Sequence, residues 1–157
     1  MFSMVHVHEI LEHSLRLVQP HMETKSILVE QFFRASQDEV NGDEYELQQA
    51  FVNLLLNAFE AMGPEGTLTI STELVTPKDS ATPQVCVTIK DTGAGILPEH
   101  MRHLFEPFFT TKASGTGLGL AVTQRICQEH HGNILVESQP GAGTTFHVML
   151  PAARAAS

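Results

Sequence analysis

Two asparagines occupy the one polar stripe of a segment that otherwise has the composition of a core helix. Residues 44–62 carry large apolar side chains at helical spacing on almost every side. The stripe contains Gln49, Asn53, Asn57 and Glu60, at intervals of four, four and three residues. A buried amide without a partner costs about 1–3 kcal/mol, so the pattern indicates either a satisfied hydrogen-bond network in the core or the polar wall of a ligand cleft. Amide oxygens suit Mg²⁺, which usually takes only one or two protein ligands in phosphate sites.

Three glycine-rich segments are further candidates for binding a ligand. Asp91–Ile96 follows an apolar strand, where a carboxylate can accept a hydrogen bond from an exocyclic amine and glycines let a flat ring approach the backbone. Gly115–Leu120 leads into a helix, where free backbone N–H groups favour a phosphate. This second segment matches neither the P-loop nor the dinucleotide fingerprint. Gly141–Phe146 lies between two strands and is equally typical of a simple hairpin turn.

Around these segments the pattern of apolar residues predicts a mixed α/β domain. The expected helices are residues 8–22, 44–62, 98–105 and 118–130, and the expected strands are residues 27–33, 67–75, 85–90, 134–138 and 144–150. Asn41-Gly42-Asp43 is expected to form a turn, with Asp43 as a helix N-cap. Because no repeat or linker divides the chain, we expect one domain over residues 1–151 and a frayed tail over residues 152–157.

The composition excludes several classes of protein. Nine Lys and Arg residues against 18 Asp and Glu residues give a formal charge of −9, which argues against binding nucleic acid or an anionic membrane surface. No apolar run reaches the ~20 residues of a membrane span. Cys86 and Cys127 lie too far apart in the sequence for a zinc motif, and a disulfide scaffold is not expected either. We therefore expect a soluble, cytoplasmic domain.

The nine histidines include two close pairs that invite a metal-binding interpretation. His6 and His8 form one pair, and His130 and His131 form the other. Neither pair has cysteine or carboxylate partners at the spacing of a zinc site. The sequence therefore predicts surface histidines rather than metal ligands.

Taken together and in order, these segments resemble the catalytic, ATP-binding domain of bacterial sensor histidine kinases, in the superfamily that includes DNA gyrase, MutL and the heat-shock chaperone ATPases. The resemblance spans residues 5–151. Its motifs are the asparagine box at 49–58, the first glycine box at 91–96, the phenylalanine box at 105–109, the second glycine box at 115–120 and the final glycine turn at 141–146. Residues 105–112 are similar to the subgroup with the nitrogen-regulation sensor kinases. The resemblance implies a two-layer α/β sandwich of the Bergerat type, a mixed sheet with helices on one face.

The resemblance also implies how ATP would bind, between the asparagine helix and a lid at residues 108–115. Asp91 would accept the adenine amine, Asn57 would hold Mg²⁺, and Asn53 beside it would contact Mg²⁺ or phosphate. Lys112 could reach the terminal phosphate, or could be a solvated lysine. The remaining nucleotide contacts implied by the motifs are Gly93, Gly95, Ile96, Phe108, Thr111, Gly115, Thr116, Gly117, Leu118, Gly119 and Thr145, with the N–H groups of residues 117–119 cradling the phosphates.

Two departures from the superfamily bear on the reaction. Asn53 stands where gyrase-like and chaperone ATPases carry a glutamate that activates water, and an amide cannot act as a general base. The His8-Glu9 pair lacks the proline of an acceptor-histidine box. We therefore expect transfer of the γ-phosphoryl group of ATP to a histidine on a separate dimerisation and phosphotransfer domain, with a response regulator downstream and this domain alone a monomer.

Two other functions stay open at this stage. A hydrolytic ATPase of the superfamily is disfavoured by Asn53, although the role of Glu60 on the same stripe is undecided. A regulatory module similar to anti-sigma factors would keep the same fold but phosphorylate a serine of a partner protein. The segment 105–112 favours the histidine kinase over this second alternative.

Overall fold

A computed structural model describes residues 1–79, 82–107, 109 and 119–153. The elements in chain order are β1 (Ser3–His6), α1 (Val7–Met22), β2 (Ser26–Phe33), β3 (Glu39–Gly42), α2 (Glu44–Ala61), β4 (Glu65–Val75), β5 (Gln84–Asp91), α3 (Pro98–Met101), α4 (Gly119–Glu129), β6 (Asn133–Gln139) and β7 (Gly143–Pro151). In this described part, no helix is long and apolar enough to cross a membrane.

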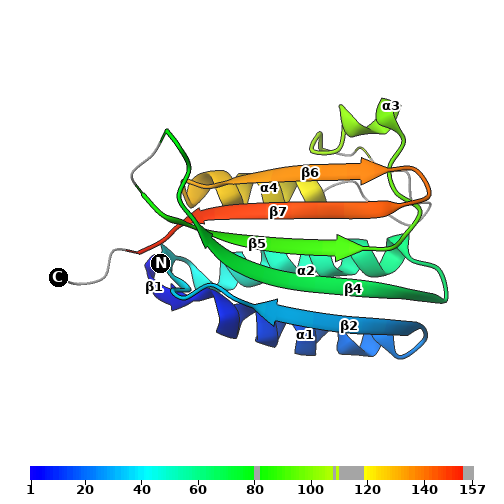
Figure 1. Cartoon of the computed structure of the whole chain (residues 1–157), viewed down its shortest axis with the longest axis horizontal. Helices are drawn as coiled ribbons and strands as arrows, with labels where there is room; N and C mark the ends of the chain where they lie inside the picture. Colours follow the sequence, from blue (N-terminus) through cyan, green and yellow to red (C-terminus); the bar gives the residue numbers. More distant parts are fainter. Residues whose placement is uncertain (80–81, 108, 110–118, 154–157) are drawn as a thin grey trace.

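The described strands form one large mixed sheet and one small sheet. The large sheet has the order β2-β4-β5-β7-β6, in which β2 runs parallel to β4 and the other neighbours are antiparallel. The helices α1, α2 and α4 lie side by side on one face of this sheet (Figure 1). The expected two-layer sandwich with a mixed sheet and helices on one face is therefore confirmed.

Helix α2 is the centre of the core. Its side chains Leu47, Phe51 and Leu54 are fully buried between the sheet and the flanking helices α1 and α4. Asp43 caps the helix as expected, because its Oδ1 accepts a hydrogen bond from the Glu46 N–H at 3.0 Å. The strands alternate between buried and partly exposed residues, as expected for a sheet covered on one face.

Asn41 and Gly42 were expected to belong to a turn but form the second half of β3, which spans Glu39–Gly42. This strand pairs with β1 to make the two-stranded sheet, with His6 opposite Glu39 and Ser3 opposite Gly42. The prediction was wrong because the partner strand lies more than thirty residues earlier, and the strand itself is too short to show a period. Glycine at position 42 lets this strand pack closely on His130, because an added Cβ would lie only 2.8 Å from the His130 ring.

Three further expectations need correction. The tail was expected to be frayed from residue 152, yet Ala152 pairs with Val40 and the Ala153 N–H donates to the Glu39 carbonyl at 2.8 Å. The helix expected at residues 98–105 is regular only to Met101 and continues as turns.

His130, which was expected on the surface, is buried. Its Nε2 accepts from the Asp43 N–H at 3.0 Å, and its Nδ1 donates to the Ile126 carbonyl at 2.8 Å.

Candidate nucleotide-binding site

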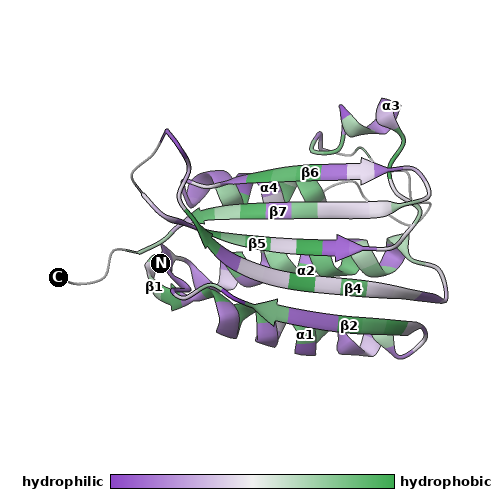
Figure 2. Cartoon of the chain, in the orientation of Figure 1, coloured by the Kyte–Doolittle hydropathy of each residue, from purple (hydrophilic) through white to green (hydrophobic). Residues whose placement is uncertain are grey.

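Asp91 is a buried carboxylate at the end of an apolar strand. The alternation of β5 places Asp91 on the same side as Val87 and Ile89, the side that faces the helices, and the last residues of this strand are hydrophilic (Figure 2). Only 2% of Asp91 is exposed. Its Oδ1 accepts from the Gly93 N–H at 2.8 Å and from the Thr144 N–H at 3.3 Å. These bonds hold the carboxylate in one orientation at the end of the central strand of the sheet.

Two glycines allow the backbone to approach closely around Asp91. A Cβ on Gly93 would lie 2.5 Å from the carbonyl oxygen of Ala61, the last residue of α2. Gly143 has a φ of +95°, and its Cβ would overlap the carbonyl oxygen of Asp91. The Ala94 N–H donates to the same Ala61 carbonyl at 3.1 Å. The end of α2, the loop after β5 and the start of β7 therefore meet at Asp91.

The loop after β5 is also fastened to the β6–β7 turn. The Ile96 N–H donates to Ser138 Oγ at 2.8 Å, and this hydroxyl lies 2.9 Å from Thr144 Oγ1. Gly95 has a φ of +78°, and a Cβ there would overlap the Gln139 carbonyl. The structure thus brings the predicted residues Gly93, Gly95 and Ile96 together with Asp91.

Thr145 is not part of this cluster. It pairs with Lys90 in the β5–β7 ladder, and the alternation of β7 places it on the sheet face away from the helices. Thr144, one residue earlier, is buried on the side of Asp91 and donates to it. Of the two adjacent threonines, Thr144 lies beside Asp91 in this structure and the predicted Thr145 does not. Counting back in steps of two from the apolar Phe146 would have selected Thr144.

Two other residues of this cluster were missed from the sequence. Ser138 links the loop to β7, as described above, and Met62 is buried next to Thr92, whose Oγ1 lies 3.7 Å from the Met62 sulfur. In the sequence Met62 is an ordinary apolar residue at the end of a helical segment. Its place directly after α2, within reach of the loop that follows Asp91, was not visible without the fold.

Asn53 joins α2 to the first turn of α4. Its Nδ2 donates to the Gly119 carbonyl at 3.3 Å and to Thr123 Oγ1 at 3.4 Å, and the Thr123 hydroxyl donates to the same carbonyl at 2.8 Å. Because a carbonyl oxygen only accepts, the amide nitrogen must be the atom that faces Gly119. The Asn53 oxygen is therefore directed away from this contact.

The asparagine stripe leads along α2 to the Asp91 cluster. Asn53, Asn57 and Ala61 are spaced four residues apart, so they lie on one side of the helix, about one turn of ~5.4 Å after another. Ala61 is the residue whose carbonyl contacts the loop after Asp91. Asn53 and Asn57 are both half-buried, and Glu60 beside them is exposed. The two sets of predicted residues therefore belong to one continuous surface along α2.

The donor set along this stripe fits Mg²⁺ bound to phosphates. The side chains are half-buried amides, whose oxygens are hard neutral ligands, and Mg²⁺ at a phosphate site keeps waters and phosphate oxygens as its other ligands.

Some of the predicted nucleotide contacts lie outside the described residues: Phe108, Thr111, Lys112, Gly115, Thr116, Gly117 and Leu118. Gly119 lies inside them, exposed as the first residue of α4.

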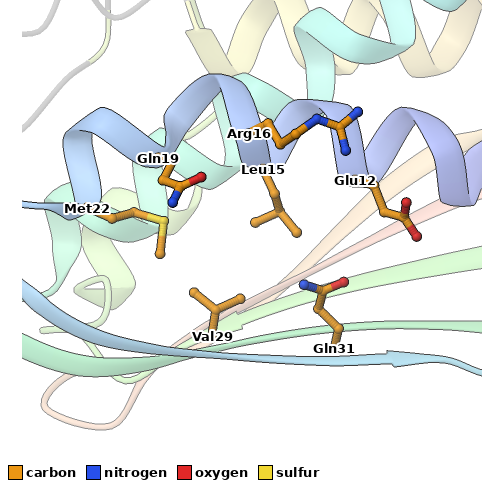
Figure 3. Close-up of a pocket in the computed structure, with 7 residues that line it drawn as sticks. All are labelled: Glu12, Leu15, Arg16, Gln19, Met22, Val29 and Gln31. Carbon is orange, nitrogen blue, oxygen red and sulfur yellow. The ribbon is translucent and has the colours of Figure 1, made fainter.

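A hollow of about 350 Å³ between α1 and β2 belongs to a different part of the molecule (Figure 3). Its lining combines apolar and polar side chains: Glu12, Leu15, Arg16, Gln19, Met22, Val29 and Gln31. None of these is a predicted site residue. The hollow is therefore distinct from the Asp91 and Asn53 surface.

Comparison with known proteins agrees with the fold and with the order of the motifs. Residues 42–154 match the family described as histidine kinase-, DNA gyrase B-, and HSP90-like ATPase. The sensor histidine kinase ZraS of Salmonella typhi is 40% identical over 147 residues, which is 94% of this chain and 30% of that protein. This chain thus spans between about a fifth and a third of the length of the curated relatives that it matches.

Solved structures of histidine kinases have the same fold as this chain. Full-length ShkA in complex with AMPPNP has a TM-score of 0.81 at 26% identity, covering 99% of this chain and 32% of that one. Histidine kinase ThkA in complex with response regulator protein TrrA has a TM-score of 0.78 at 27% identity, covering 97% and 42%.

The chain belongs to the histidine kinase-, DNA gyrase B-, and HSP90-like ATPase family, and within it corresponds to the catalytic domain of two-component sensor histidine kinases. Membership of this ATPase family implies that the domain binds ATP. The narrower likeness to nitrogen-regulation kinases stays a prediction.

Proposed function

We propose that this domain binds Mg²⁺-ATP and transfers the γ-phosphoryl group to a histidine on a separate dimerisation and phosphotransfer domain, for onward transfer to a response regulator. The proposal rests first on Asp91, a carboxylate buried at a strand end and oriented by two backbone N–H groups. A buried acceptor beside close-packed glycine backbone suits the exocyclic amine and flat ring of adenine. The relatives' names support the kinase assignment. We place the domain in the cytoplasm, where ATP is supplied.

The polar stripe on α2 would serve the phosphate end of the nucleotide. Mg²⁺, when bound, would neutralise charge that develops on the transferred phosphoryl group. Asn57 would offer its amide oxygen to the cation, one turn from the Asp91 cluster. Asn53 is held from the α4 side through its nitrogen, so its oxygen is available to Mg²⁺ or phosphate. Lys112 and the N–H groups of residues 117–119 remain the proposed partners of the phosphates.

Transfer to a protein is favoured over hydrolysis by the chemistry of Asn53. Its nitrogen donates to Gly119 and Thr123, and an amide has no basic site that could deprotonate water. The domain would contribute positioning and charge stabilisation, which supply most of the catalysis in phosphoryl transfer. Glu60 is exposed on the same stripe and is the described carboxylate that a hydrolytic reaction would use.

Incubation with γ-labelled ATP tests the proposal. The domain alone should neither label itself nor release phosphate quickly. Addition of a cognate dimerisation domain should give label on that domain that acid removes, as expected for phosphohistidine. The Asn57→Ala variant should lose this transfer, whereas His21→Ala, on the surface of α1, should retain it.

Three results would overturn the proposal. One is the absence of any transfer to cognate dimerisation domains when the parent domain binds ATP. Another is acid-stable label on a serine of a partner, which would indicate the regulatory module. The third is rapid phosphate release by the domain alone that is lost in Glu60→Gln, which would indicate a hydrolytic ATPase.

A further inference from the structure

The small β1–β3 sheet brings together three potential metal ligands that are far apart in the sequence. His6 and Glu39 are opposite each other in the antiparallel pair, and Asp38 directly precedes β3. The donor atoms of these three side chains all lie within 4.8 Å of one another. His6 Nδ1 is 3.2 Å from Asp38 Oδ1, close to the separation of two ligands that share one cation, since metal–ligand bonds of ~2.0–2.2 Å place neighbouring donors ~3–3.5 Å apart.

Asp38 is held in place by its neighbours on the other side. Its Oδ2 accepts from the His8 backbone N–H at 3.0 Å and lies 3.5 Å from His8 Nδ1. The His8 ring is itself fixed, because its Nε2 lies 2.7 Å from Thr72 Oγ1 and its plane stacks on Phe33 at 4.9 Å. With Oδ2 engaged at the start of α1, Oδ1 is the oxygen directed to His6. Such supporting contacts orient ligands in metal sites.

The charges at this cluster favour a cation. Asp38 and Glu39 place two carboxylates beside His6. The N-terminus of α1 contributes about half a positive elementary charge, which two carboxylates outweigh. The two carboxylates therefore give the cluster the negative charge that a divalent cation would neutralise.

We propose that His6, Asp38 and Glu39 form a binding site for a divalent transition-metal cation of the Zn²⁺ class. One imidazole nitrogen and two carboxylate oxygens are a borderline ligand set that suits Zn²⁺ better than Mg²⁺ or Ca²⁺, and three protein ligands leave a position for water. The site lies at the N-terminal end of the domain, away from α3 and the end of β5 (Figure 1). It is therefore separate from the proposed nucleotide site and independent of it.

The cation would join the two strands of the small sheet to each other. A two-stranded sheet is marginally stable by itself, and here β1 is joined to β3 by four residue pairs. Ligands from β1, from the residue before β3 and from β3 itself would connect both strands at the point where α1 begins. Binding should therefore raise the melting temperature of the domain, by mass action on the folded state.

Calorimetric titration of the chelator-treated domain with Zn²⁺ tests the site. The parent should bind one Zn²⁺ with an affinity that falls at least about ten-fold in His6→Ala and in Glu39→Gln. The matched control is His21→Ala, which removes an exposed histidine at the opposite end of α1. Circular dichroism should confirm that each variant is folded.

Location is tested separately with paramagnetic Co²⁺ and nuclear magnetic resonance. Co²⁺ should broaden the amide signals of residues 5–8 and 38–40 and leave those of residues 91–95 unchanged. Equal Zn²⁺ affinity in the parent and His6→Ala would overturn the proposal. So would the absence of Zn²⁺ binding, or Co²⁺ broadening centred on another histidine.

Discussion

The side chain of Asp91 continues the β5–β7 ladder by one step beyond its last backbone pair. The register of the two strands ends at Lys90 opposite Thr145. At the next position, Asp91 Oδ1 accepts the Thr144 N–H at 3.3 Å and also the Gly93 N–H at 2.8 Å. A carboxylate thus takes the place of a backbone carbonyl where the strands separate. Its orientation is set by the sheet itself, so the proposed acceptor for adenine is already held in place by the fold.

The first prediction concerns the charge of this acceptor. Asp91→Asn preserves the volume and leaves one oxygen for Gly93 and Thr144, but it replaces the other oxygen by a donor that would face the adenine amine. The lost charge-assisted hydrogen bond and the mismatch together cost about 2–3 kcal/mol, or roughly 30–150-fold in affinity for ADP. Calorimetric titration with ADP measures this change, and an affinity equal to that of the parent would rule out the adenine assignment.

The second prediction separates two adjacent threonines. Thr144→Val removes the hydroxyl that lies 2.9 Å from Ser138 Oγ on the side of Asp91, so it should weaken ADP binding by about five- to ten-fold, the value of one hydrogen bond. Thr145→Val changes the opposite face of β7 and should leave ADP affinity within two-fold of the parent. The reverse order of effects in the same titration would place the nucleotide on the other face of the sheet.

The sequence predicts those parts of this fold that depend on local periodicity. The helix at residues 44–61 and its Asp43 cap, and the strands of the large sheet, follow from apolar spacing and turn residues. Features that depend on distant partners could not be predicted in this way. The pairing of β3 with β1 is one such feature, and the approach of Asp38 to His6 across 32 residues is another.

The candidate site likewise contains residues that could be predicted from the sequence and contacts that could not. Asp91, Asn53 and Asn57 could be chosen because a polar residue in an apolar pattern is visible in the sequence itself. The link from Asn53 to Thr123 could not, because it depends on how α2 packs against α4. The choice between Thr144 and Thr145 depends on a strand register of one residue, and a shift of one residue moves a side chain to the other face.

The third prediction concerns Mg²⁺. Asn57→Ala should abolish the part of ATP affinity that depends on magnesium, because it removes the proposed amide-oxygen ligand. Adenosine binding should remain nearly intact, since the Asp91 cluster lies at the end of the helix beyond Ala61. Titration with ATP, once in the presence of magnesium and once with a chelator, separates the magnesium-dependent part of the affinity from the part that does not need magnesium. Equal magnesium dependence in the variant and the parent would mean that the cation is bound elsewhere.

The fourth prediction treats Thr123 as a positioning residue for Asn53. Thr123→Val keeps the shape of the fully buried side chain but removes the hydroxyl that accepts from Asn53 Nδ2 and donates to the Gly119 carbonyl. The Asn53 amide should lose its fixed orientation, and Mg²⁺-ATP affinity should fall by about three- to ten-fold while adenosine affinity is unchanged. Thr123→Ser retains the hydroxyl and should restore binding. Failure of the serine variant to do so would indicate a packing defect instead.

The last prediction concerns the close approach of backbone at Asp91. Gly143 has a φ of +95°, and an added Cβ would overlap the Asp91 carbonyl oxygen, so Gly143→Ala requires β5 or β7 to move. The strained backbone conformation alone costs about 1–3 kcal/mol. The matched control is Gly63→Ala, because a Cβ on Gly63 would meet nothing within 4 Å.

Thermal unfolding followed by circular dichroism measures both substitutions. Gly143→Ala should lower the melting temperature by several degrees, since for a domain of this size 1 kcal/mol corresponds to roughly 2–4 °C. It should also weaken ADP binding, because the displaced backbone carries the Thr144 N–H away from Asp91. Gly63→Ala should change neither quantity appreciably. Equal melting temperatures for the two variants would show that β5 and β7 do not approach each other closely at Asp91.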